Sequence, residues 1–114
     1  MVTEVMHPNE TEFESLLRSE NLLLVDFFAT WCSPCKMLSP VIEDLANKYW
    51  NKVKVVKIDI DQHPDIAGKY DVQSVPTVFL FKNGKIIESS VGFNPLSHFT
   101  SWITTQEQSI TNQN

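Results

Sequence analysis

The pattern of apolar and polar residues in the first quarter of the chain predicts a helix followed by a buried strand. Asn9 and Glu12 form a capping-box pattern, and apolar residues recur behind them at helical spacing until about Ser19. Residues 22–28 are almost continuously apolar, which is typical of a strand buried on both faces of a parallel sheet. Residues 2–6 are expected to add a short first strand.

The middle of the chain predicts a second helix and a second buried strand. Pro34 lies where the first turn of a helix would begin, and apolar residues continue at helical spacing as far as Tyr49. Another apolar run, residues 53–60, follows. Strand, helix and strand in this order form a crossover unit, so the two strands should be parallel.

The next segments predict a short helix and a hairpin. The helix is expected over residues 64–70. Two apolar runs, residues 77–81 and 86–91, flank Asn83 and Gly84. Because Asn-Gly between apolar runs is a strong hairpin signal, this half of the sheet should be antiparallel.

A last amphipathic helix completes the pattern. Asn94-Pro95 has the pattern of a helix cap with proline at the first helical position. We therefore expect an α/β fold, with a central mixed sheet of four to five strands and helices on both faces. It should be one domain over residues 1–105, followed by a polar, frayed tail over residues 106–114. The apolar face of the last helix is expected to consist of Leu96, Phe99 and Ile103.

Composition and charge narrow the functional classes. The 114 residues carry a net charge of -5, which would repel a phosphate backbone and argues against nucleic acid as a partner. The N-terminus has an acid and no apolar core where a signal peptide would need basic and apolar residues. The longest apolar stretch is about eight residues, far short of the roughly 20 that span a bilayer. We expect a cytoplasmic monomer without membrane attachment, in which Trp50 and Trp102 are packing residues.

Two cysteines, Cys32 and Cys35, lie at the junction of the first buried strand and the long helix. Three interpretations compete. A zinc site needs four nitrogen or sulfur ligands, yet His7, His63 and His98 supply no second close-spaced pair. A purely structural disulfide would gain only about 2 kcal/mol from closing a four-residue ring, against about 4.7 kcal/mol for 100 residues.

The third interpretation is a catalytic dithiol. Cys32 would lie at the helix N-terminus, where unpaired N–H groups and the helix dipole favour a thiolate. Cys35 follows three residues later on the same helix face, within reach of the first sulfur. In thiol–disulfide exchange, Cys32 would attack a disulfide and Cys35 would resolve the mixed disulfide. The position of the pair favours this chemistry over the other two.

The sequence around the pair resembles the active site of the thioredoxin family. The motif runs from Phe27 to Lys36 as Phe-Phe-Ala-Thr-Trp-Cys-Ser-Pro-Cys-Lys. Ser33 stands where related thioredoxins usually have glycine, and Phe28 stands where they usually have tryptophan. The resemblance extends to about residue 103 and takes in, in the expected order, Asp26, Pro40, Lys57-Ile58-Asp59, Val75-Pro76-Thr77, Phe81-Lys82-Asn83-Gly84 and Val91-Gly92.

The resemblance implies the thioredoxin fold and the reduction of protein disulfides without a bound cofactor or metal. Electrons would come from NADPH through the flavoprotein thioredoxin reductase. In a bacterium the clients would be ribonucleotide reductase, peroxiredoxins and methionine sulfoxide reductases. The alternative is a redox-inert binding module that uses the same groove. An intact cysteine pair together with Trp31, Asp26 and Pro76 favours the enzyme.

Asp26 is an acid inside an apolar strand, where loss of hydration would raise the pKa of its carboxyl group. The sequence also allows an acid at a turn or at a sheet edge. The resemblance implies instead a buried proton acceptor that helps Cys35 to lose its proton, with Lys57 on the neighbouring strand modulating its charge.

The resemblance also implies residues that support the dithiol and bind clients. Pro76 would follow a cis peptide that faces the dithiol, leaving the backbone of Val75 free to pair with an extended client segment. Trp31 would cover the sulfurs and offer an apolar surface. Support is also expected from Ser33, whose hydroxyl should alter the redox potential, and from Pro34 and Lys36. The client groove is expected to consist of Trp31, Ile60, Ser74, Val75, Pro76, Val91, Gly92 and Phe93.

Overall fold

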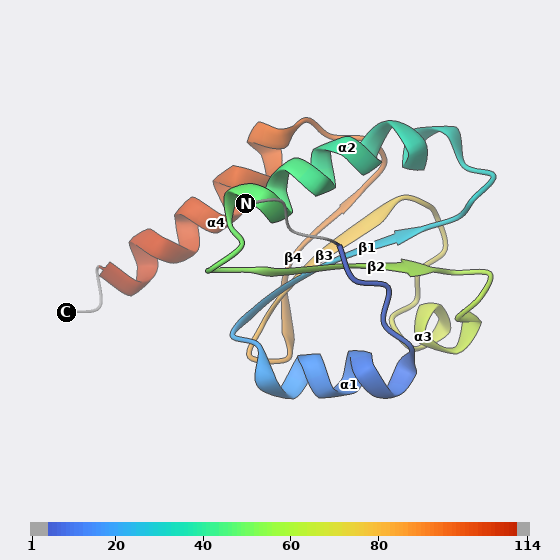
Figure 1. Cartoon of the computed structure of the whole chain (residues 1–114), viewed down its shortest axis with the longest axis horizontal. Coiled ribbons are helices and arrows are strands. Elements are labelled where there is room, and N and C mark those ends of the chain that lie inside the picture. Colours follow the sequence, from blue (N-terminus) through green and yellow to red (C-terminus); the bar gives the residue numbers. More distant parts are fainter. Residues whose placement is uncertain (1–4, 112–114) are drawn as a thin grey trace.

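A computed structural model describes residues 5–111, which form four helices and a four-stranded sheet (Figure 1). Of the first strand expected over residues 2–6, residues 2–4 lie outside the described part, and Met6 makes a single parallel bridge with Val56. The elements are α1 (Glu10–Ser19), β1 (Leu22–Phe28), α2 (Ser33–Lys48), β2 (Lys54–Asp59), α3 (Pro64–Lys69), β3 (Thr77–Lys82), β4 (Lys85–Val91) and α4 (Leu96–Thr111). From α1 to β4, the bounds of the predicted helices and strands are confirmed to within one or two residues.

The sheet is mixed, as predicted, with the strand order β2-β1-β3-β4. β1 is parallel to β2 and antiparallel to β3, and β3 and β4 form the antiparallel hairpin. Asn83 and Gly84 both have positive φ values, 50° and 81°, which the tight turn requires. β1 is therefore a central strand, and Asp26 in the middle of it lies directly beside Lys57 of β2.

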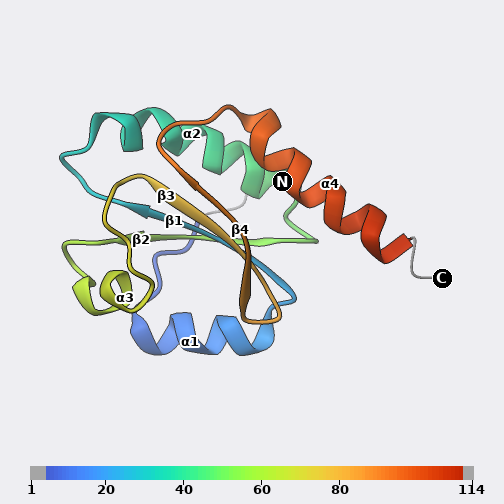
Figure 2. The ribbon, with the colours of Figure 1, turned by 180° about the vertical axis from the view of Figure 1, so that it is seen from behind.

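Each face of the sheet is covered by a pair of helices (Figures 1 and 2). Side chains alternate along β1, so that Leu22 and Leu24 enter the core below α2 and α4, while Leu23 and Val25 enter the core above α1 and α3. Phe99, on the predicted apolar face of α4, is fully buried in the first core. Because the alternation continues, Asp26 faces α2.

The C-terminal helix differs from the prediction at both ends. It begins at Leu96, so that Pro95 lies directly before the helix and its carbonyl oxygen accepts a hydrogen bond from the backbone of His98. It continues to Thr111 and so includes much of the segment that we expected to fray. Gln106 accepts a hydrogen bond from Lys82. Glu107 pairs with Lys52 at 2.9 Å, which ties this helix end to the body of the molecule.

Of the two tryptophans predicted to be packing residues, the structure buries only one. Trp102 is buried in the core below α2 and α4, as predicted. Trp50 is 55% exposed, so its interpretation as a packing residue is wrong. It follows the end of α2, where the chain turns toward β2.

Candidate active site

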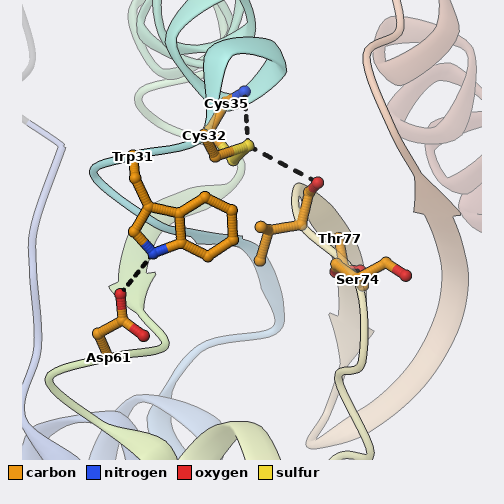
Figure 3. Close-up of a disulfide and its surroundings, with 7 residues drawn as sticks. Trp31, Cys32, Cys35, Asp61, Ser74 and Thr77 are labelled. Atoms are coloured by element: carbon orange, nitrogen blue, oxygen red, sulfur yellow. Dashed lines mark hydrogen bonds between the residues drawn. A yellow bond between two sulfur atoms is a disulfide. The ribbon is translucent and has the colours of Figure 1, made fainter.

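Cys32 and Cys35 lie where the chain leaves β1 and enters α2, and a disulfide joins them (Figure 3). Their Cα atoms are 5.2 Å apart. Cys32 is the N-cap residue of α2, and its Sγ accepts a hydrogen bond from the backbone N–H of Cys35 at 3.2 Å. A sulfur in this position takes the place of a capping oxygen, so a thiolate formed on it would be stabilised by the helix N-terminus.

The neighbours of the two sulfurs distinguish them, whereas burial does not, since Cys32 is 4% exposed and Cys35 is 3% exposed. Sγ of Cys32 lies 3.7 Å from the carbonyl oxygen of Val75, at the loop before β3. Cys35 instead lines a cavity of about 230 Å³ together with Lys57 and Ser39. Cys32 thus borders a surface loop, and Cys35 borders a cavity that also contains an ammonium group.

The loop before β3 has the cis peptide that we expected, between Val75 and Pro76. The hydroxyl of Thr77 donates a hydrogen bond to the carbonyl oxygen of Ser74 at 2.6 Å, which closes the loop around that peptide. The backbone N–H of Gly92 donates to the carbonyl oxygen of Pro76 at 2.8 Å. This bond brings the chain after β4 alongside the loop and the disulfide.

The residues predicted to bind clients lie on four segments, at Trp31, at Ile60, in the loop before β3 and from the end of β4 onward. Large apolar side chains are exposed at Trp31 (67%), Val91 (65%) and Phe93 (43%). Ile60 is partly buried and packs against the two cysteines. The structure places the other predicted site residues nearby. Four of these side chains are exposed, namely Ser74 and, in the first turn of α2, Ser33, Pro34 and Lys36. Val75 and Gly92 are half-buried, and Pro76 is buried.

Trp31 is held in place by a contact that the sequence did not suggest. Its Nε1 donates a hydrogen bond to Oδ2 of Asp61 at 2.9 Å, and Figure 3 shows the indole ring beside the disulfide with this bond on its far side. Asp61 is itself oriented by its backbone N–H, which donates to Oδ1 of Asp59. The position of Asp61 directly after a buried strand was the available signal, because carboxyl ends of parallel strands gather at one edge of a sheet.

Asp26 is fully buried in the central strand, so the alternative of a turn or edge acid is wrong. Neither carboxylate oxygen has a hydrogen-bond partner. Burial raises the pKa of Asp26 from its ordinary value of 3.8 to about 7, although the positive charge of Lys57 opposes this rise. The protein therefore holds, in its core beside Lys57, an acid that is half ionised near neutral pH.

Lys57 joins the acid to the cavity beside Cys35. It is the neighbour of Asp26 in the register of β1 and β2, on the same face of the sheet. Its Nζ lies 4.7 Å from the centre of the Phe28 ring and donates a hydrogen bond to Oγ of Ser39 at 2.9 Å. Ser39 was not predicted, although its spacing of four residues from Cys35 places both on one helix face.

The arrangement of these groups is suited to one kind of chemistry. A cysteine pair lies at a helix N-terminus, with exposed apolar side chains around it. A buried acid of raised pKa lies beside Lys57, which lines the same pocket as Cys35. Within residues 5–111, no cluster of three or more His, Cys, Asp or Glu side chains could hold a metal ion. In the same part of the chain, no helix has both the length and the apolar character to cross a membrane. The fold and the site define a thiol–disulfide oxidoreductase.

Comparison with known proteins gives the family. The family model for thioredoxin matches residues 4–105. Thioredoxin of Rickettsia bellii is 47% identical over 90 residues (79% of this chain and 86% of the relative), and thioredoxin of Bacillus subtilis is 51% identical over 77 residues (68% and 74%). The oxidised mitochondrial thioredoxin 3 of Saccharomyces cerevisiae, 38% identical, superposes with a TM-score of 0.75 over 95% of this chain and 94% of its own. A mutant thioredoxin of Halobacterium salinarum, 35% identical, gives 0.81 over 89% and 88%.

The chain belongs to the thioredoxin family. The predicted thioredoxin fold and the predicted protein-disulfide oxidoreductase activity are confirmed. Members of this family generally bind no cofactor themselves. Membership implies two kinds of partner, namely thioredoxin reductase and proteins that contain disulfides.

Proposed function

We propose that this thioredoxin reduces protein disulfides through attack by Cys32, resolution by Cys35 and proton acceptance by Asp26. The observation that carries the proposal is the asymmetry of the two sulfurs. Cys32 caps the helix and borders the loop of Val75, whereas Cys35 borders the cavity that contains the ammonium of Lys57. These surroundings support attack on a client by Cys32 and transfer of a proton from Cys35 to the interior.

The electrons balance over two steps. The thiolate of Cys32 attacks one sulfur of a client disulfide, which forms a mixed disulfide and releases the other client sulfur as a thiolate. Cys35 then gives its proton to the carboxylate of Asp26, and the new thiolate attacks Sγ of Cys32. This attack breaks the mixed disulfide, releases the second client thiolate and forms the Cys32–Cys35 disulfide. Two electrons have passed to the client, and a pKa of about 7 suits Asp26 to accept a proton near neutral pH.

The surface around the sulfurs supports a role in binding extended client segments. The exposed side chains of Trp31, Val91 and Phe93 offer apolar contacts. The backbone of Val75 lies beside Cys32, where it can pair with a client strand next to the disulfide under attack. When Cys32 is reduced, its thiol can donate to the Val75 carbonyl oxygen, which lies 3.7 Å away in the oxidised form.

The disulfide must be reduced again for turnover. We propose that NADPH supplies the electrons through a flavoprotein thioredoxin reductase, and that a monomer works in the cytoplasm, where thiols are kept reduced. The proposed clients are ribonucleotide reductase, peroxiredoxins and methionine sulfoxide reductases. Consumption of NADPH in the presence of a bacterial thioredoxin reductase, this protein and insulin tests the recharging step. No consumption above that of reductase and insulin alone would contradict it.

The roles of the two sulfurs can be tested with paired variants. The wild type should accelerate the reduction of insulin by dithiothreitol, and both Cys32→Ser and Cys35→Ser should abolish the acceleration. Only Cys35→Ser should accumulate a mixed disulfide with insulin, because it can attack but cannot resolve. The adduct is measured by non-reducing mass spectrometry. An equal amount of adduct in Cys32→Ser would show that the roles are not divided as proposed, and a wild type without activity would end the enzyme assignment.

A further inference from the structure

A single hydroxyl group holds the ammonium of Lys57 in the cavity beside Cys35. Nζ of Lys57 donates a hydrogen bond to Oγ of Ser39 at 2.9 Å, which joins β2 to α2. Ser39 follows Cys35 by four residues, and both line the same cavity of about 230 Å³, with Lys57 on another wall. Ser39, Lys57 and the resolving cysteine thus line one pocket.

The ammonium is held close to Asp26 without being bonded to it. Both carboxylate oxygens of Asp26 are buried and have no hydrogen-bond partner. The contacts of the ammonium are instead the Ser39 hydroxyl and the face of the Phe28 ring, 4.7 Å from its centre. Its charge nevertheless acts on Asp26, because it lowers the pKa of this acid against the larger effect of burial.

We propose that Ser39 is a positioning residue for the resolving step, which holds the Lys57 ammonium where it faces both the Asp26 carboxylate and the Cys35 sulfur. The proposal rests on the proposed function, in which the proton of Cys35 passes to Asp26. Before the transfer the negative charge is on Asp26, and after it the charge is on Cys35. The Lys57 ammonium attracts the negative charge in both positions, so it stabilises the protein before and after the proton transfer. The transfer therefore never leaves a buried negative charge without a nearby positive one.

The surroundings of Lys57 indicate where the ammonium would go without the hydroxyl. A second pocket of about 240 Å³ shares Phe28, Thr30 and Lys57 with the first. An ammonium that loses its protein acceptor must find water or another acceptor, and the second pocket offers both solvent and Asp59. In Ser39→Ala, we therefore expect Lys57 to turn toward the second pocket, which raises the pKa of Asp26 and removes the counter-charge from Cys35.

The other groups around the cavity do not take over this role. Lys36 of α2 also lines the first cavity, but its side chain is exposed. In β3, the strand on the other side of Asp26, the paired residue is Val78, which carries no charge. The remaining titratable groups, His7, Asp59 and His63, line the second pocket and are unchanged by a substitution at position 39.

The test separates the two chemical steps in the full-length protein. Reduced protein is mixed with dithiobis(nitrobenzoate), a small aromatic disulfide, so that attack by Cys32 releases one coloured thiolate and resolution by Cys35 releases the second. In Ser39→Ala the second phase at pH 7 should slow by roughly three- to tenfold relative to the first. The midpoint of its pH profile should move up by about half to one pH unit, which corresponds to the same factor. Ser39→Thr keeps the hydroxyl and should restore both values.

Lys57→Met supplies the matched background. There Ser39→Ala should have no further effect on the midpoint, because no ammonium remains to be held. An unchanged midpoint in Ser39→Ala, or an equal shift in the Lys57→Met background, would overturn the proposal, as would a failure of Ser39→Thr to restore it. If the wild type reduces insulin and Ser39→Ala keeps the wild-type midpoint of the second phase, only the role of Ser39 is refuted. If the wild type does not reduce insulin, the proposed function is refuted.

Discussion

Asp26 makes the folded state less stable whenever it is ionised, because its carboxylate lies in the core without a hydrogen bond. A rise in the pKa of Asp26 from 3.8 to about 7 means that ionising its carboxyl group costs up to about 4 kcal/mol more free energy in the folded protein than in the unfolded chain. This is a large share of the roughly 5–15 kcal/mol that stabilises a domain. A group so costly to the fold is typical of a functional site, where a perturbed pKa serves chemistry.

The pH dependence of stability tests this cost. The folded protein keeps the proton of Asp26 up to about pH 7, whereas the unfolded chain releases it near 3.8. Between these values the folded state binds more protons, so the wild type loses stability as the pH rises, and the loss is complete above about pH 7. Asp26→Asn removes this loss. Its free energy of unfolding in guanidinium chloride should match the wild type at about pH 4 and exceed it by up to about 4 kcal/mol at pH 8.

Asp44→Asn is the matched control, because Asp44 is exposed on α2 and should change stability by less than about 0.5 kcal/mol at either pH. If Asp26→Asn and the wild type differed by the same amount at pH 4 and pH 8, the raised pKa would be wrong. In the reaction with dithiobis(nitrobenzoate), Asp26→Asn should slow the second phase of thiolate release and leave the rate of the first phase unchanged. Only the resolving step needs the proton acceptor.

At the scale of elements, the sequence predicted what depends on local patterns. β1 and α2 follow from a continuous apolar run and from helical spacing behind Pro34, and the hairpin follows from Asn83 and Gly84. α4 begins one residue later than predicted, at Leu96 instead of Pro95. A proline is compatible with the last position before a helix as well as with the first position within it. The polar end of α4 is helical and makes hydrogen bonds with Lys52 and Lys82. These two residues come from distant segments, so a local sequence pattern does not reveal the contacts.

The same distinction divides the site. The cysteine pair and the cis peptide before Pro76 belong to local motifs, and the pairing of Asp26 with Lys57 follows from two adjacent parallel strands. For Ser39 and Asp61 the sequence indicates a place near the site but not the hydrogen bonds that they make. Each joins polar residues on separate elements, and whether they meet depends on how a helix or a loop crosses the sheet.

The capping box of α1 provides a prediction at this scale. Oδ1 of Asn9 accepts from the N–H of Glu12 at 2.8 Å, and Oε1 of Glu12 accepts from the N–H of Asn9 at 2.9 Å. Asn9→Ala leaves the first N–H groups of the helix without this partner and should cost about 1 kcal/mol of unfolding free energy in urea. Asn9→Ser keeps an acceptor oxygen and should cost only a few tenths of a kcal/mol. Equal losses in the two variants would show that the cap does not stabilise α1.

At the scale of the whole molecule, one sheet serves two cores and supports the dithiol at its edge. Alternate residues of β1 and β3 enter opposite cores, so that neither core exists without the strands of the other. α2 is held by the core that contains Phe99 and Trp102, and the disulfide lies at its first turn. The position of the sulfurs therefore depends on the packing of both faces, although α1 and α3 lie on the face away from α2 (Figure 1).

This shared sheet predicts that damage to one face is felt on the other. Phe13 of α1 is 2% exposed and packs edge-on against Phe81 and Tyr70, so Phe13→Ala should cost roughly 3–5 kcal/mol. Trp102, 7% exposed, reports on the opposite core, while Trp31 and Trp50 are largely exposed. Because the cores share strands, tryptophan fluorescence and far-ultraviolet circular dichroism should show one coincident unfolding transition in guanidinium chloride, moved to lower denaturant. Phe13→Leu, which keeps much of the apolar volume, should move it less. A fluorescence transition that stayed at the wild-type midpoint while the dichroism transition moved would show that the core of α2 and α4 folds without the other face.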